Sequence, residues 1–192
     1  MAGFLGMALV VLGQAAVVAR DTVPETTWDD LVPADWDPLK AFEDVQHLAD
    51  LPDTDPQVQK LYDRMREVWD NAPTVPALEG RSVRLPGYVV PLETGKTGLR
   101  EFLLVPYFGA CIHTPPPPAH QIVHVRLSRP LRGVGTMDAV WVTGRLGRER
   151  SASALGASGY QLDATTVTKY AADEGSEDRD DAGQQGDRRS RH

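Results

Sequence analysis

Apolar and polar positions follow two different periods along this chain. From Pro56 to Trp69 the apolar side chains recur every three or four residues, which places them on one face of a helix. They are Val58, Leu61, Tyr62, Met65, Val68 and Trp69. Asp55 and Pro56 offer an N-cap and a first-turn proline. The pattern therefore predicts one amphipathic helix, whose apolar stripe we expect to face the core of the domain.

After Pro73 the apolar positions recur at every second residue, as in β-strands. This period predicts strands at residues 83–90, 101–107, 121–127, 139–146 and 160–170. Pro86-Gly87 predicts a bulge or sharp bend that lets the long first strand serve two sides of a small barrel. We therefore expect a mainly β (α+β) fold, a small five-stranded OB-like barrel preceded by the helix; a small β-sandwich is the alternative.

The segments outside this β-rich domain of residues 56–170 have a different composition. Residues 1–19 carry no charge and end in small residues, which predicts a signal peptide cleaved after Ala19 or a retained membrane anchor; a buried helix of the domain is the alternative. Residues 20–55, rich in proline, tryptophan and acidic side chains, predict an extended arm with at most a short helix at 39–48. Residues 171–192 contain no large aliphatic side chain and predict a disordered polar tail.

Composition and charge exclude several classes of protein. A chain of 192 residues fits one domain with tails. The formal net charge of -7 and the lack of a basic stripe argue against nucleic-acid binding. Cys111 is the one cysteine, so an internal disulfide framework is excluded. We expect membrane contact only through residues 1–19, if they are kept.

The connection between the second and third predicted strands, PYFGACIHTPPPPAHQ, carries the candidate chemistry. Its four prolines, 115–118, favour a stiff polyproline II rod that holds the preceding loop in a fixed pose. Cys111 and His113 offer a thiolate and an imidazole, which are preferred ligands of zinc and copper. His120 and His124 are weaker candidates; on an extended strand they would share one face, about 7 Å apart.

Two other readings of Cys111 and His113 stay open. One is a buried structural thiol beside a hydrogen-bonded histidine. The other is a Cys–His nucleophile pair, although no third group is placed to orient His113. No nucleophile-elbow serine, Gly-rich phosphate loop or H-E-x-x-H helix occurs in the chain. The sequence therefore predicts no catalytic or cofactor-binding residue.

Several segments together resemble a known bacterial family. TWDDLVP, LPGYVVPLE, FLLVPYFGACIHTPPPP, QIVHV and VWVTGRL, in this order from Trp28 to Tyr170, are similar to domain of unknown function 3299 (DUF3299). The resemblance implies an exported or lipid-anchored envelope protein, associated with zinc-responsive transport systems, and implies no activity. The family's motif carries over onto Cys111, His113 and residues 115–118, but not onto the two later histidines. This chain lacks the lipobox cysteine of many exported relatives.

Ligand chemistry and the resemblance together lead to one leading hypothesis. We expect a non-enzymatic accessory protein in the periplasm, or on the extracytoplasmic face of the inner membrane, that binds zinc or copper through the Cys111-x-His113 loop. A protein-interaction module is the second hypothesis, with the proline loop and the Trp-bearing arm docked on components of an envelope transporter. A thiol-dependent enzyme or redox protein, which needs an exposed Cys111 of low pKa, is the third.

Overall fold

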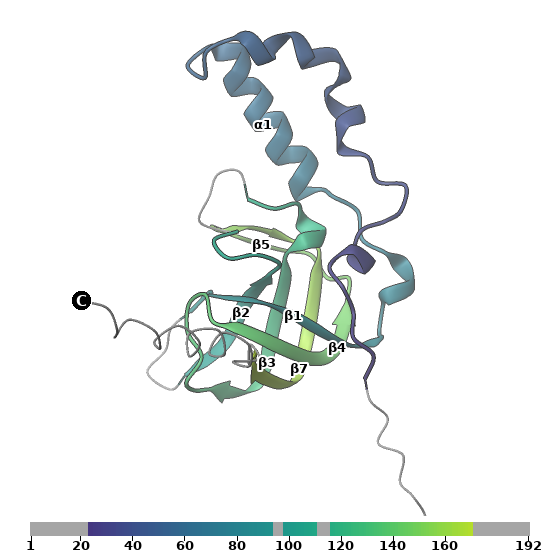
Figure 1. Ribbon diagram of the computed structural model, residues 1–192, viewed down its shortest axis with the longest axis vertical. Coiled ribbons are helices and arrows are strands. Elements are labelled where there is room, and N and C mark those ends of the chain that lie inside the picture. Colours follow the sequence, from purple (N-terminus) through teal and green to yellow (C-terminus); the bar gives the residue numbers. More distant parts are fainter. Residues whose placement is uncertain (1–22, 94–97, 111–115, 171–192) are drawn as a thin grey trace, which may run out of the picture.

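The computed structural model describes residues 23–93, 98–110 and 116–170 (Figure 1). The predicted N-terminal segment 1–19 and the predicted tail 171–192 lie outside the described residues, as do Cys111 and His113. Within the described part of the chain, no helix is long and apolar enough to cross a membrane.

The predicted amphipathic helix is present as α1 (Pro56–Asp70). Its first turn forms as expected, because the Asp55 carboxylate accepts the Gln57 amide at 2.8 Å. Its apolar stripe does not enter the barrel core: Val58 is its one buried residue, and α1 instead packs against η2 (Pro38–Asp50), a 3₁₀ helix of the arm. The two helices project together beyond the barrel (Figure 1), and Arg64 joins Asp44 at 3.0 Å between them. Helix η2 is longer than the short helix predicted at 39–48.

Five strands close into a barrel, which confirms the predicted fold class over the sandwich alternative. They are β1 (Ser82–Pro91), β2 (Leu99–Val105), β3 (Val123–Leu131), β4 (Ala139–Gly147) and β7 (Tyr160–Lys169), in the order β1-β2-β3-β7-β4. β3 and β7 run parallel, and every other pair in the barrel is antiparallel. A small hairpin, β5 (Ser151–Ser153) and β6 (Gly156–Ser158), lies between β4 and β7 in sequence and was not predicted.

The first strand serves two sides of the barrel, as its Pro86-Gly87 pair predicts. Residues 82–88 of β1 pair with β4 and residues 88–91 pair with β2, so Tyr88 belongs to both ladders. The register against each partner runs without a shift, and the strand therefore bends without a bulge. Gly87 permits this, because a Cβ at that position would lie 2.8 Å from both Leu104 Cγ and the Val105 carbonyl oxygen.

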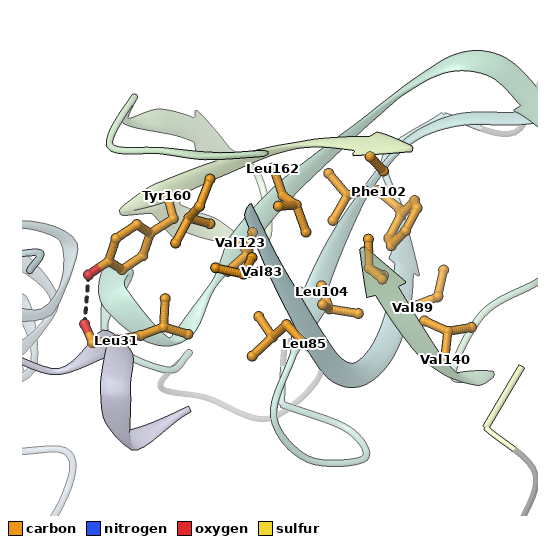
Figure 2. Packing of buried hydrophobic residues seen from close by; sticks show 14 of the residues in the cluster. Leu31, Val83, Leu85, Val89, Phe102, Leu104, Val123, Val140, Tyr160 and Leu162 are labelled. Carbon is orange, nitrogen blue, oxygen red and sulfur yellow. Dashed lines mark hydrogen bonds between the residues drawn. The ribbon is translucent and has the colours of Figure 1, made fainter. Parts of the chain in front are cut away.

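The barrel interior holds the main hydrophobic core (Figure 2). It is built from alternate residues of all five strands, among them Val83, Leu85, Phe102, Leu104, Val123, Val125, Val140, Val142 and Leu162. The arm contributes Leu31, from the short 3₁₀ helix η1 (Asp29–Leu31), which is 0% exposed. The buried Tyr160 hydroxyl donates to the Leu31 carbonyl at 2.8 Å and accepts the Val75 amide, just before η3 (Pro76–Leu78), at 2.7 Å. The arm is therefore part of the folded domain.

A second hydrophobic cluster covers the outer face of β1 and β2. Val90, Leu103 and Val105 point outward from these strands and are buried together with Ala110 and Ile122. Ala110 belongs to the first part of the proline-containing connection between β2 and β3, and Ile122 is the last residue of this connection before β3. The ends of this connection therefore pack on the outside of the barrel.

Candidate functional site

His120 is the predicted ligand residue with the most unusual surroundings. It lies in the 3₁₀ helix η4 (Ala119–Gln121), directly after the proline run, and is 1% exposed. Its ring meets Trp36 of the arm edge to face, with centroids 4.3 Å apart. One ring nitrogen bonds the Pro73 backbone, whereas Nδ1 is buried and has no hydrogen-bond partner among the described residues. A buried nitrogen of this kind is rare and calls for an explanation.

The electrostatic surroundings keep the His120 imidazole neutral. Burial lowers its pKa from 6.5, and the nearby positive charge of Arg150 lowers it further, while the bond to Pro73 acts in the opposite direction. Because Nδ1 has no partner, we assign the contact with the Pro73 backbone to Nε2; a neutral ring protonated there leaves a lone pair on Nδ1. A neutral imidazole with one nitrogen free is the form that binds metal ions.

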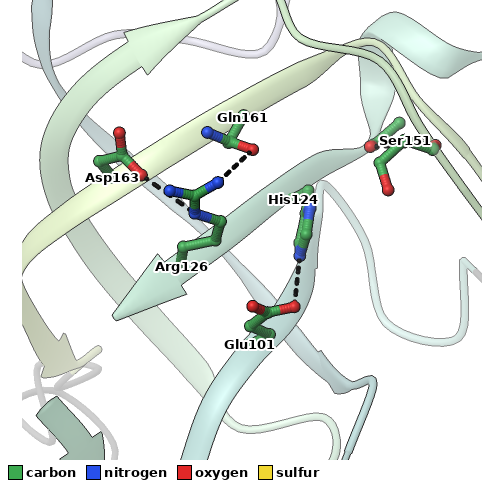
Figure 3. Close-up of polar contacts among 7 residues, drawn as sticks. Glu101, His124, Arg126, Ser151, Gln161 and Asp163 are labelled. Atoms are coloured by element: carbon green, nitrogen blue, oxygen red, sulfur yellow. Dashed lines mark hydrogen bonds and ion pairs between the residues drawn. The ribbon is translucent and has the colours of Figure 1, made fainter. Parts of the chain in front are cut away.

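His124 lies on the outer face of β3 in a different environment (Figure 3). Its Nε2 is 3.2 Å from Oε2 of Glu101 on β2. Arg126, two residues along the same face, bonds Gln161 at 3.2 Å and Asp163 at 3.3 Å on β7. These contacts form a row of polar side chains across three strands, in which His124 is already paired.

The predicted arrangement of the two histidines on one face of a strand is wrong. Residues 119–121 form a helical turn, closed by the Gln121 amide on Pro118 and the Ile122 amide on Ala119, and β3 begins only at Val123. His120 consequently packs under the arm while His124 faces Glu101. No group of three or more His, Cys, Asp or Glu side chains within the described ranges could hold a metal ion. The positions of Cys111 and His113 lie outside those ranges, so their role stays a prediction.

An aromatic pocket, which sequence reasoning missed, lies where the arm crosses the end of the barrel. It is lined by Trp28, Pro86, Gly87, Tyr88, Pro106, Ala139 and Tyr170 and encloses about 160 Å³. The Trp28 indole N–H donates to the Pro86 carbonyl at 2.8 Å, which fixes the ring at the wall of the pocket. Its lining residues come from five separate segments, so no local motif marks it. The signal that the sequence offered was Trp28, one of the two tryptophans in a proline-rich, acidic arm.

Aromatic side chains continue outward from this pocket. Tyr170 stacks on Trp141 with centroids 5.7 Å apart, and the guanidinium of Arg84 lies 3.9 Å above the Trp141 ring. On the other side, Phe108 meets Tyr88 edge to face at 5.9 Å. Phe108 is 68% exposed, the neighbouring Tyr107 is 54% exposed and Tyr170 is 49% exposed. The pocket is therefore flanked by exposed aromatic side chains.

Comparison with known proteins identifies the family. A DUF3299 family protein from Pseudomonas aeruginosa, solved by crystallography, is 37% identical, with a TM-score of 0.61 over 79% of this chain and 98% of that chain. A small single-stranded DNA-binding protein from Streptomyces coelicolor aligns at 17% identity over 48% of this chain and 95% of that chain, with a TM-score of 0.31, too low to bear on fold or function. No curated protein matches the chain. The sequence model described as "Protein of unknown function (DUF3299)" matches residues 28–169. The chain therefore belongs to the DUF3299 family.

Proposed function

We propose that this protein is a non-enzymatic accessory protein of the bacterial envelope that binds zinc or copper. Cys111 and His113 are its first two ligands, as the chemistry of thiolate and imidazole favours. The protein works in the periplasm or on the extracytoplasmic face of the inner membrane, beside the components of a metal transporter.

The observation that supports this proposal best is the state of His120. Metal-binding histidines usually donate their second ring N–H to a carbonyl or carboxylate, which fixes the tautomer and aims the free nitrogen at the metal. His120 fits this arrangement: its ring contacts the Pro73 backbone, and the buried Nδ1 has no partner within the described ranges. It also follows the proline run that begins two residues after His113. His120 is therefore the third donor, in preference to His124, whose Nε2 is taken by Glu101.

A set of one thiolate and two imidazoles suits metal handling better than permanent metal storage. Structural zinc sites are closed by four protein ligands, whereas sites with three protein ligands keep one position open. An open position admits a ligand from another protein, and metal exchange between two proteins needs such a shared intermediate. A site with these three donors therefore favours a role in the transfer of metal ions between proteins.

Metal analysis of the full chain, purified from the periplasm without chelator, tests the proposal. We expect about one equivalent of zinc or copper in the wild type, and none in the Cys111→Ser/His113→Ala double variant. His120→Gln should lower the metal content, whereas His47→Gln, at an exposed position of η2, should leave it unchanged. Wild-type protein that carries no metal and gains no thermal stability from added zinc or copper would refute metal binding. Full metal content in a folded His120→Gln variant would refute only the assignment of His120 as the third ligand.

A further inference from the structure

We propose that the aromatic pocket is a second binding site, independent of the metal site, which takes a proline residue from an extended, basic peptide segment of a partner protein. The occupant follows from three properties of the described residues: the size and lining of the pocket, the exposed rings beside it, and the charge of the arm.

The size and lining of the pocket select a small uncharged group. A volume of about 160 Å³ is well below the ~300–1,000 Å³ of pockets that hold whole small molecules, so the space suits one side chain. None of the seven lining residues is charged, and three of them are aromatic. The Trp28 N–H is already used by Pro86, so this residue offers only its ring. A proline ring packs well against such surfaces, because aromatic-lined grooves are the usual receptors of proline-rich segments.

The tyrosines of the pocket supply the polar half of this recognition. No hydrogen bond joins the hydroxyl of Tyr88 or Tyr170 to another described residue. A polyproline II segment has no internal hydrogen bonds, so its carbonyl oxygens are free to accept from these two hydroxyls. The exposed rings of Tyr107 and Phe108 continue the apolar surface beyond the pocket. The ligand is therefore longer than one residue and lies in an extended conformation.

The charge of the arm selects a basic peptide. Residues 23–39 contain five acidic side chains and no lysine or arginine. Asp29 and Asp30 directly follow Trp28, a lining residue of the pocket, and both are exposed. Glu25 pairs with Arg84, which leaves the arm with a net negative charge. A peptide with lysine or arginine beside its proline complements this surface, and an acidic peptide is repelled.

Titration of the full-length protein with three synthetic peptides tests the proposal by calorimetry. The probes are GRPPPPRG, its alanine analogue GRAAAARG and its acidic analogue GEPPPPEG. We expect GRPPPPRG to bind, and both analogues to bind at least about tenfold more weakly. Tyr170→Ala should weaken the binding of GRPPPPRG by about tenfold, as the loss of a central aromatic contact does. Tyr62→Ala, at an exposed tyrosine of α1, is the matched control and should bind as the wild type does.

Three results would overturn the proposal. One is equal affinity for the proline and alanine peptides, or no binding of either; another is unchanged affinity in Tyr170→Ala. The third is a different occupant. Binding to phosphatidylcholine vesicles that Tyr170→Ala abolishes would assign the exposed rings to a lipid interface. Concentration-dependent dimers that Tyr170→Ala abolishes would assign them to a second copy of the chain. Tyr170→Ala should keep the metal content of the wild type, so this site and the metal site fail or succeed separately.

Discussion

Removal of the Tyr160 hydroxyl should loosen the attachment of the arm to the barrel. In Tyr160→Phe the ring still fills its place in the core, but two backbone groups lose their partner: the Leu31 carbonyl and the Val75 amide. An unsatisfied buried group costs about 1–3 kcal/mol, and the loss of an ordinary hydrogen bond costs about 1 kcal/mol. Leu31 is fully buried and Val75 is half-buried, so we expect the free energy of unfolding to fall by about 2–4 kcal/mol. This is a large share of the ~5–15 kcal/mol that stabilises a typical domain.

Urea unfolding measures this loss directly. The midpoint should fall while the dependence of the free energy on urea stays unchanged, because the variant buries the same surface. Tyr62→Phe is the control: the Tyr62 hydroxyl bonds Asp53 at 3.1 Å on the exposed side of α1, and its removal should cost less than about 0.5 kcal/mol. A loss in Tyr160→Phe no larger than in the control would refute the idea that this hydroxyl holds the arm. Faster hydrogen exchange of the Val75 amide should accompany the loss.

Three further predictions concern other parts of the domain. Gly87→Ala should lower the unfolding free energy by about 1–3 kcal/mol in thermal melts, since its Cβ would overlap the neighbouring strand, whereas Gly135→Ala, with open space around it, should have little effect. In metal-free protein, the free energy of unfolding should fall as the pH drops below 6.5 towards the lowered pKa of His120, because in this range only the unfolded chain takes up the proton. Urea titrations should show a slope of at most about 1.4 kcal/mol per pH unit from this group, and His120→Gln should lose it. Arg150→Lys should destabilise the end of α1 by about 1–3 kcal/mol, seen as faster amide exchange there. The two terminal nitrogens of the guanidinium bond three carbonyls, and the single ammonium nitrogen of lysine cannot occupy both positions.

The barrel could be predicted because most of its strand residues follow a two-residue period, which β1 keeps throughout. Val83, Leu85 and Val89 of β1 all point inward. The Pro86-Gly87 pair predicted the bend of β1 between its two partner strands. The hairpin of β5 and β6 escaped prediction because its three-residue strands of small side chains show no alternation. The start of β3 was placed two residues early, because Ile122, Val123 and Val125 give this segment the β-branched composition of a strand. The backbone of residues 119–121 instead forms a helical turn, and β3 begins at Val123.

Long-range packing was the part that local patterns could not show. The apolar stripe of α1 has the same helical period whether the helix packs on a barrel or on another helix. The period therefore could not predict that η2 is the packing partner. His120 was predicted as a candidate ligand. Its burial and the contact of its ring with the backbone depend on Trp36 and Pro73, which are far away in sequence, so the sequence pattern could not show them. The aromatic pocket likewise exists only once the arm lies across the barrel end.

The position of the last strand has a consequence for the biosynthesis of the protein. β7 lies between β3 and β4, so both of these strands present unpaired backbone groups until residues 160–169 have been synthesised. A nascent or truncated chain that ends before this point has two open sheet edges, which are templates for aggregation. Folding is thus delayed until almost the whole domain is available. Such a delay keeps the chain unfolded for longer during synthesis, the state in which a protein can still be threaded through a membrane channel.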